Sequence, residues 1–87
     1  MKIKEGFVVR PIAGQHMVVA LGEASKSFNG IIKLNESARI IWDMLVVGAE
    51  YDEVVDRLSE EYDVDRAVLA ADCDRFIQSL KENNILE

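Results

Sequence analysis

The chain contains very little cysteine, proline, histidine and tryptophan, and these scarcities exclude several classes of protein. Each of the four residue types occurs once in 87 residues. A single cysteine cannot form an internal disulfide and fits a reducing compartment. One thiol and one imidazole do not supply the ligands of a usual zinc site, so the sequence predicts no metal and no other cofactor.

Positive charge is scarce as well. Lys and Arg number 10 against 16 Asp and Glu, which gives a net charge of −6 and a pI near 4.7. Such a surface repels a phosphate backbone, so nucleic acid is not an expected partner. No stretch approaches the ~20 apolar residues of a membrane span, and Met1 to Glu5 lacks the apolar run of a signal peptide. We expect a soluble cytoplasmic protein with no membrane partner.

Hydrophobic residues are plentiful, at 49% of the chain. This fraction argues against disorder, and the length is enough for one small domain with a dense core. Repeats, low-complexity tracts and linkers are absent from the sequence. We therefore predict a single domain over residues 1–87.

The first part of the chain has the pattern of a β-hairpin. Phe7 to Ile12 and His16 to Leu21 are rich in β-branched residues. The loop between them, Ala13-Gly14-Gln15, contains a glycine that can adopt the positive φ of a tight turn. Pro11 cannot donate a ladder hydrogen bond, which suits an edge strand or a strand end.

Side-chain alternation describes the faces of the sheet. In the second strand Met17, Val19 and Leu21 share one face, and His16, Val18 and Ala20 share the other. Neither face is strongly polar, so we expect both to be partly covered. After a polar connector over Gly22 to Asn29, a third strand is predicted at Gly30 to Leu34. There Ile32 and Leu34 alternate with Ile31 and Lys33, and one of these pairs should face the core.

The period changes from strand-like to helical at Leu34-Asn35. Asn35 is a favoured N-cap, Glu36 places negative charge in the first turn, and Gly48 is the expected stop. The core-facing stripe of this helix is predicted to be Ala38, Ile41, Trp42 and Leu45, widened by Ile40, Met44 and Val47. Trp42 lies in the middle of the widest apolar stripe, so it should anchor the core.

Two further helices are predicted. The second runs from about Tyr51 to Tyr62, and Glu50 is a poor cap for it. Its inward residues should be Tyr51, Val55, Leu58 and Tyr62, and those of the third helix, from about Arg66 to Asn83, should be Leu69, Cys73, Phe76 and Leu80, broadened by Ile77. Asn84 can adopt the left-handed position that ends a helix, which lets Ile85 and Leu86 fold back onto the core.

Nothing in the sequence points to catalysis. Cys73 is expected in the core and His16 at the solvent margin of a strand, and there is no phosphate loop or nucleophile elbow. The acidic run from Asp52 to Asp65 is either a solvated face or a patch for a basic partner. A DNA-binding winged helix is not expected, because the third helix carries two Arg and two Asp in Arg66 to Arg75.

Several short motifs, in order along nearly the whole chain, carry a family resemblance. They are Phe28-Asn29-Gly30, Leu34-Asn35-Glu36, Trp42 with Leu45, Gly48, Leu58 with Tyr62-Asp63-Val64, and Ile85-Leu86. Together they resemble the PqqD family, the peptide chaperones of pyrroloquinoline quinone biosynthesis and related recognition domains for ribosomally made, modified peptides. Ala38 and Asn84 replace a frequent Gly, and Glu50 replaces a usual Thr cap. These departures affect helix packing and capping.

The resemblance implies an α+β, winged-helix-like fold, with a three-stranded antiparallel sheet followed by a three-helix bundle. It also implies a non-catalytic protein that binds the leader of a precursor peptide and presents it to a modifying enzyme, often a radical-SAM protein. The leader is expected to add as a strand to the third strand, beside the third helix. The expected peptide-binding residues are Gly30, Ile31, Ile32, Lys33, Val68, Asp72, Arg75 and Phe76.

Two points stay open at this level. Only alternate residues of a strand direct their N–H and C=O groups to a free edge, and the sequence does not fix which residues of Ile31 to Lys33 do so. The alternative function is a structural or regulatory module that forms a homodimer through the same edge and binds no peptide.

Overall fold

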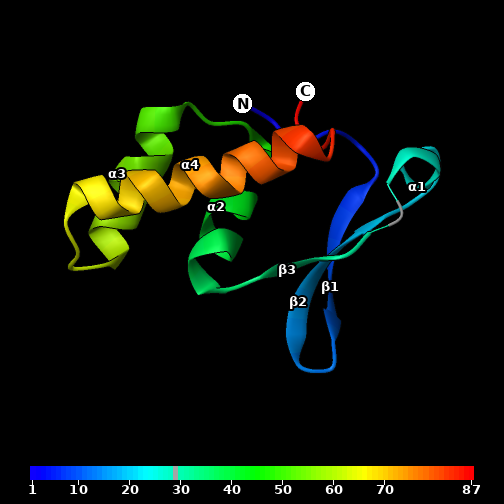
Figure 1. Ribbon diagram of the computed structural model, residues 1–87, viewed down its shortest axis with the longest axis horizontal. Helices are drawn as coiled ribbons and strands as arrows, with labels where there is room; N and C mark the ends of the chain where they lie inside the picture. Colours follow the sequence, from blue (N-terminus) through cyan, green and yellow to red (C-terminus); the bar gives the residue numbers. More distant parts are fainter. Residues whose placement is uncertain (29) are drawn as a thin grey trace.

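The computed structural model describes residues 1–28 and 30–87 and contains a small antiparallel sheet joined to a helical bundle (Figure 1). The elements are β1 (Phe7–Ile12), β2 (Gln15–Ala20), α1 (Ala24–Ser27), β3 (Ile32–Leu34), α2 (Glu36–Val47), α3 (Tyr51–Glu61) and α4 (Arg66–Glu82). The three predicted strands and the three longer helices are present, which confirms the α+β fold class. The third strand is shorter than predicted, because it begins at Ile32, and Gly30 and Ile31 precede it. Residue 29, in the predicted connector and in one resemblance motif, lies outside the described residues.

The hairpin turn is shorter than predicted. Ala13 and Gly14 both have positive φ, 52° and 77°, and Ile12 pairs directly with Gln15. A two-residue turn with two positive φ angles is the type I′ turn, whose twist matches that of the flanking strands. Gln15 therefore belongs to β2 rather than to the loop.

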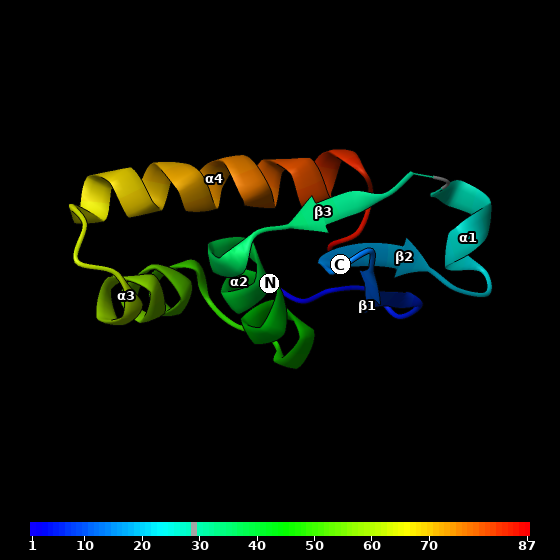
Figure 2. The ribbon, with the colours of Figure 1, turned by 90° about the horizontal axis from the view of Figure 1, so that it is seen from below.

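The sheet has the order β1-β2-β3, and both pairings are antiparallel. Because β2 is central, one edge of β1 and one edge of β3 have no strand partner among the described residues. Figure 2 shows β3 between α4 and the other two strands, with its free edge on the α4 side. Pro11 lies in the edge strand β1, as predicted.

The core lies between one face of the sheet and the helices. Its members on α2 are those predicted, Ala38, Ile41, Trp42 and Leu45. From the sheet, Val18 and Leu34 are buried, so Ile32 and Leu34 are the pair that faces the core. Phe7 and Phe28 pack edge-to-face with ring centroids 5.6 Å apart.

Two predicted helix stripes need correction. On α4 the buried residues are Leu69, Cys73, Ile77 and Leu80, so Ile77 belongs to the stripe and Phe76 is only half-buried beside it. On α3 the fully buried residues are Val54, Val55 and Leu58, while Tyr51 and Tyr62 are half-buried. A helix turns 100° per residue, so two adjacent apolar residues point in different directions. The sequence pattern alone did not show which residue of such a pair, Phe76 or Ile77, faces the core.

The predicted polar connector contains the one-turn helix α1. Ser25 Oγ donates to the Gly22 carbonyl at 2.6 Å, and the Phe28 N–H donates to the Ala24 carbonyl at 3.1 Å. The start of α3 also differs from the prediction, because the Glu53 carboxylate accepts the Glu50 N–H at 3.0 Å. The predicted poor cap is therefore part of a reciprocal capping box.

The chain ends lie side by side (Figure 1). Ile3 N–H donates to the Leu45 carbonyl at 2.9 Å, and Lys4 N–H donates to the Ile85 carbonyl at 2.8 Å. Asn84 has φ 59°, and Ile85 and Leu86 are buried, as predicted. Across the described residues, the helices are too short or too polar to span a bilayer.

Candidate peptide-binding groove

A groove of about 390 Å³ separates the free edge of β3 from α4. Its walls are Lys33 on β3 and Leu69, Asp72, Arg75 and Phe76 on α4, and it is closed by Asn35, Ser37, Ala38, Ile41 and Leu58. Ala38 and Ile41 of α2 and Leu58 of α3 are buried and form the floor, whereas Lys33, Asp72 and Arg75 place charged groups on the walls. The groove therefore has an apolar floor, and its walls carry both the charged groups and the apolar Leu69 and Phe76.

The strand register determines which backbone groups face this groove. The Leu21 N–H donates to the Gly6 carbonyl at 2.7 Å, on the β1 side of β2. Hydrogen-bonding direction alternates along an antiparallel strand, so Met17 and Val19 also bond toward β1. His16 and Val18 must then bond toward β3, where their partners are Leu34 and Ile32.

The same alternation applies to β3. Because Ile32 and Leu34 direct their N–H and C=O groups to β2, Lys33 directs its own to the free edge. Ile31 immediately precedes β3 and would have the parity of Lys33 in a strand extended by one residue. The register is continuous across the β2–β3 pairing, so no bulge changes this phase. The structure thus resolves the parity that the sequence left open, and Gly30 would have the inward parity of Ile32 in such an extended strand.

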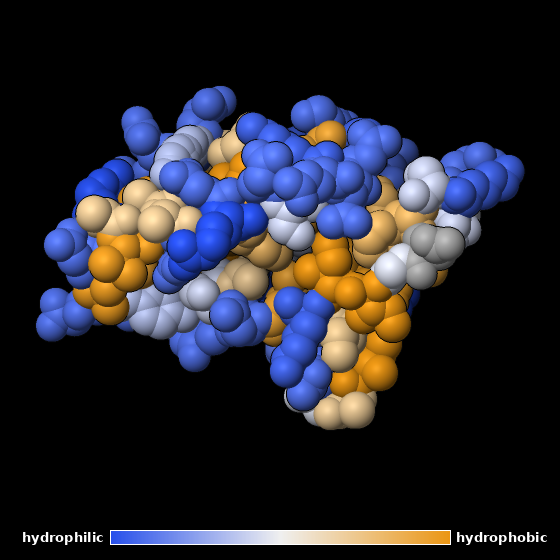
Figure 3. Space-filling model, in the orientation of Figure 1, coloured by the Kyte–Doolittle hydropathy of each residue, from blue (hydrophilic) through white to orange (hydrophobic). Residues whose placement is uncertain are grey.

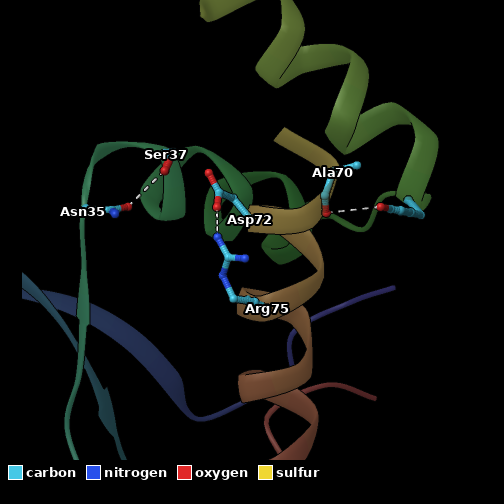
Figure 4. Close-up of polar contacts among 6 residues, drawn as sticks. Asn35, Ser37, Ala70, Asp72 and Arg75 are labelled. Carbon is cyan, nitrogen blue, oxygen red and sulfur yellow. Dashed lines mark hydrogen bonds and ion pairs between the residues drawn. The ribbon is translucent and has the colours of Figure 1, made fainter. Parts of the chain in front are cut away.

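The helix that forms the opposite wall is held by polar contacts from α3. Tyr51 Oη donates to the Ala70 carbonyl at 3.4 Å (Figure 4), and Arg66 pairs with Asp56 at 2.7 Å. The Asp74 carboxylate, followed by burial, raises the pKa of Tyr51 to about 12, so this phenol remains a donor at neutral pH. Both contacts join the N-terminal half of α4 to α3.

Polar groups inside the groove are largely paired with one another (Figure 4). Asn35 Oδ1 accepts the Ala38 N–H at 2.9 Å, which caps α2, and also accepts Ser37 Oγ–H at 3.1 Å. Arg75 forms an ion pair with Asp72 one turn earlier on α4. Both charged side chains are exposed, so this pair contributes little to stability and can rearrange around a ligand.

A second groove of about 460 Å³ continues from the first and shares Asn35, Ser37, Leu69 and Asp72 with it. It adds Glu36, Tyr62, Val64 and Val68 to its lining. Tyr62 Oη is buried and has no hydrogen-bond partner within the described part of the chain. Burial, and then the nearby Glu36 charge, raise the pKa of this phenol, so it offers an uncharged donor.

The predicted site residues therefore divide into groups. Lys33, Asp72, Arg75 and Phe76 meet in the first groove, and Val68 lies in the second. Ile32 faces β2 in the ladder, whereas Gly30 and Ile31 precede the strand and have no ladder pairing. Sequence reasoning missed Asn35, Ser37, Ala38, Ile41, Leu58 and Leu69 as lining residues. The sequence showed these residues as a helix cap or as core positions. It did not show that α2, α3 and α4 pack so that these residues line one groove.

Comparison with known proteins identifies the family and agrees with the fold. The family model described as Coenzyme PQQ synthesis protein D (PqqD) matches residues 15–86. The chain belongs to the PqqD family. The structure of TbiB1 in complex with the TbiA(beta) leader peptide has a TM-score of 0.78 and 28% identity, covering 100% of this chain and 95% of that chain.

A second solved structure is similar in fold. Lasso peptide synthetase B1 complexed with the leader peptide has a TM-score of 0.74 and 24% identity, covering 97% of this chain and 93% of that chain. No curated protein matches the chain at a significant level. The match to the PqqD family model begins at Gln15, the first residue of β2, so β1 lies outside it.

His16 and Cys73, the two residues that could act as a nucleophile or metal ligand near neutral pH, line neither groove of this PqqD-family chain. His16 is exposed, and its Nδ1 accepts from Arg39 Nη1 at 2.9 Å. Cys73 is fully buried on α4, as the core prediction required. Within residues 1–28 and 30–87, no cluster of His, Cys, Asp and Glu could hold a metal ion.

Cys73 should resist alkylation in the folded protein. Burial, and then the Asp74 charge, raise the pKa of its thiol to about 11, so little thiolate forms near neutral pH. The pKa is higher in the folded state than in the unfolded one, so this group stabilises the fold below pH 9 and loses that contribution as the pH rises to about 11.

We expect iodoacetamide to react at least about 100-fold more slowly with the native protein than with the urea-unfolded chain. Mass spectrometry of quenched samples measures both rates at mildly alkaline pH. Equal rates in the two states would show that Cys73 is accessible and that the α4 stripe is placed incorrectly.

Proposed function

We propose that this chain is a non-catalytic protein that binds the leader of a ribosomally made precursor peptide. The leader adds as a fourth strand to the free edge of β3, between β3 and α4, and is presented to a modifying enzyme. The observation that carries this proposal is the apolar-floored groove along an unpaired strand edge. The titles of the two similar structures name leader peptides as the bound partners of those proteins.

Main-chain pairing would supply the affinity. Ile31 and Lys33 each offer one N–H and one C=O to an incoming strand, and an added strand is a recurrent way to recognise peptides. These bonds are independent of the leader's sequence. Selectivity must therefore come from side chains that enter the groove.

Alternation divides the side chains of a bound leader into two sets. One set would point to the floor made by Ala38, Ile41 and Leu58 and should be apolar. Phe76 would pack against the same set from α4. The exposed Asp72 and Arg75 could pair with polar leader groups at the mouth of the groove, whereas Val68 would contact leader residues that continue into the second groove.

The partner enzyme performs the chemistry in this proposal, and a radical-SAM protein is the expected class from the family resemblance. Precursor peptides are made on cytoplasmic ribosomes, so the chain would act in that compartment. The protein alone should modify no precursor. Pyrroloquinoline quinone biosynthesis is one pathway of this kind, and the leader determines which pathway applies.

A titration with a fluorescein-labelled leader tests the proposal. The leader is taken from the short precursor gene beside the gene for this chain, and a scrambled peptide of identical composition is the control. We expect saturable binding of the leader, much weaker binding of the scrambled peptide, and backbone amide shifts at Ile31, Lys33 and α4. Equal binding of the two peptides would contradict recognition of the leader.

The competing function is a homodimer formed through the same edge. Sedimentation equilibrium of the protein with and without leader separates the two. A dimer that the leader does not dissociate and that binds no leader would favour the structural module.

A further inference from the structure

The face of the sheet that points away from the helices is unusually apolar. Its side chains, here called the outer face, are Val8, Ile12, Met17 and Val19, continued just beyond the strand ends by Leu21 and Ile31, with Arg10, Gln15 and Lys33 as the polar members. An antiparallel sheet with one solvated face normally carries alternate polar residues there. Figure 3 shows hydrophobic side chains gathered over the hairpin that projects from the bundle.

No described element packs on the outer face. Val8, Met17 and Val19 are half-buried among their neighbours, but they are not among the hydrophobic residues that contact the core. Ile31 and Leu21 are 65% and 46% exposed. The sequence predicted that this face would be partly covered. In the structure only neighbouring side chains of the sheet cover it, so the face remains open to a partner.

The charge of the outer face is opposite to that of the chain. Its charged members, Arg10 and Lys33, are both basic and exposed, and neither forms an ion pair within the described residues. The protein as a whole carries −6. Its acidic run lies on α3 and the turn after it, at the opposite end of the molecule from the hairpin (Figure 1).

We propose that the outer face is the docking surface for the modifying enzyme, through an apolar patch on that enzyme that is bordered by carboxylates. This inference rests on the proposed function. A leader strand added at β3 would continue the sheet, so its outward-pointing side chains would extend the same face beside Ile31 and Lys33. The enzyme would then contact the protein and its bound leader across one continuous surface.

Charge favours an enzyme over a second copy of this chain. A two-fold dimer through the outer face would bring Arg10 and Lys33 near the same residues of the partner copy, and like charges in an interface oppose association. An acidic partner removes this conflict and also steers the encounter. The interaction should therefore weaken as salt is added.

The test uses the modifying enzyme encoded beside the gene for this chain, with the leader present at saturation. Arg10→Glu reverses the charge of the outer face, and Val8→Thr with Val19→Thr makes it more polar while keeping β-branched strand residues. Lys81→Glu on α4 and Val47→Thr at the exposed end of α2 are the matched controls. Biolayer interferometry gives the enzyme Kd, and circular dichroism checks folding.

We expect both outer-face variants to weaken enzyme binding by about tenfold or more, with leader Kd unchanged within about twofold. The two controls should bind the enzyme like the wild type. If the outer-face variants also bind it like the wild type while leader binding is intact, the docking inference is wrong and the proposed function survives. If the wild type sediments as a dimer that the Val8→Thr, Val19→Thr double variant dissociates, a second copy occupies the outer face and the inference is overturned.

Discussion

Replacing Trp42 with alanine should lower the free energy of unfolding by about 3–5 kcal/mol. Trp42 is 2% exposed and lies on α2 between the buried Ile41 and Leu45. Removing the indole takes away transfer free energy and leaves a cavity that neighbouring elements cannot fill without moving. A small domain has only about 5–15 kcal/mol of total stability, so this change should be among the most damaging in the chain.

Urea denaturation followed by circular dichroism at the helical band measures this change, because Trp42→Ala removes the only tryptophan. Val47→Ala is a matched control on the same helix, since Val47 is 81% exposed and should change stability by less than about 0.5 kcal/mol. Trp42→Phe is a smaller step if the alanine variant does not fold. A loss below about 1 kcal/mol for Trp42→Ala would show that the core is centred elsewhere.

The long elements could be predicted because several local signals agree at their ends. Asn35 caps α2 and Gly48 ends it, and the apolar positions between them repeat at the helical period. The one-turn helix α1 has no such pattern. Its four residues are too few to define a period, and its position depends on Phe28 packing against Phe7.

The candidate groove could be located from the sequence only through family resemblance. The free edge of β3 and the flank of α4 are far apart in the chain, and no local signal joins them. The parity of β3 required a long-range observation as well, because the phase of the ladder is set by Gly6 and Leu21 and passes through β2 to β3. Side-chain alternation alone gives the two possible phases but cannot choose between them.

The capping of α3 illustrates a different limit. Glu50 is a weak cap by residue type, yet Glu53 completes the box from one turn away. The predicted weakness followed from considering one position rather than the pair.

Proline substitution along β3 should weaken leader binding directly only at alternate positions, those whose N–H faces the free edge. Lys33→Pro removes an N–H that faces the free edge, and Ile31→Pro removes the N–H that would extend this edge beyond the start of β3. Neither change removes a donor of the β2–β3 pairing, so the variants should fold. The chain already tolerates this arrangement at Pro11. Its partner on β2 is His16, which bonds toward β3, so position 11 faces the free edge of β1.

Each outward proline should weaken leader binding by at least about 1–2 kcal/mol, through the lost donor and through crowding at the edge. Lys33→Ala is the matched control, because it removes the same side chain and keeps the N–H. Ile32→Pro should act differently, since it removes a donor to β2 and so lowers the stability of the fold. Fluorescence anisotropy with the labelled leader gives binding, and thermal unfolding gives stability.

Reversing the charge of Arg75 should weaken leader binding less than either outward proline does. Arg75 and Asp72 are exposed, and exposed ion pairs contribute about 0–1 kcal/mol. The order Lys33→Pro, then Arg75→Glu, then Lys33→Ala in decreasing effect would indicate that the leader is held mainly by its backbone. If Lys33→Pro and Ile31→Pro fold and bind the leader normally, no strand adds at this edge and the leader must bind elsewhere. If Lys33→Ala weakens binding as much as Lys33→Pro, the lysine side chain rather than the strand edge is what the leader contacts.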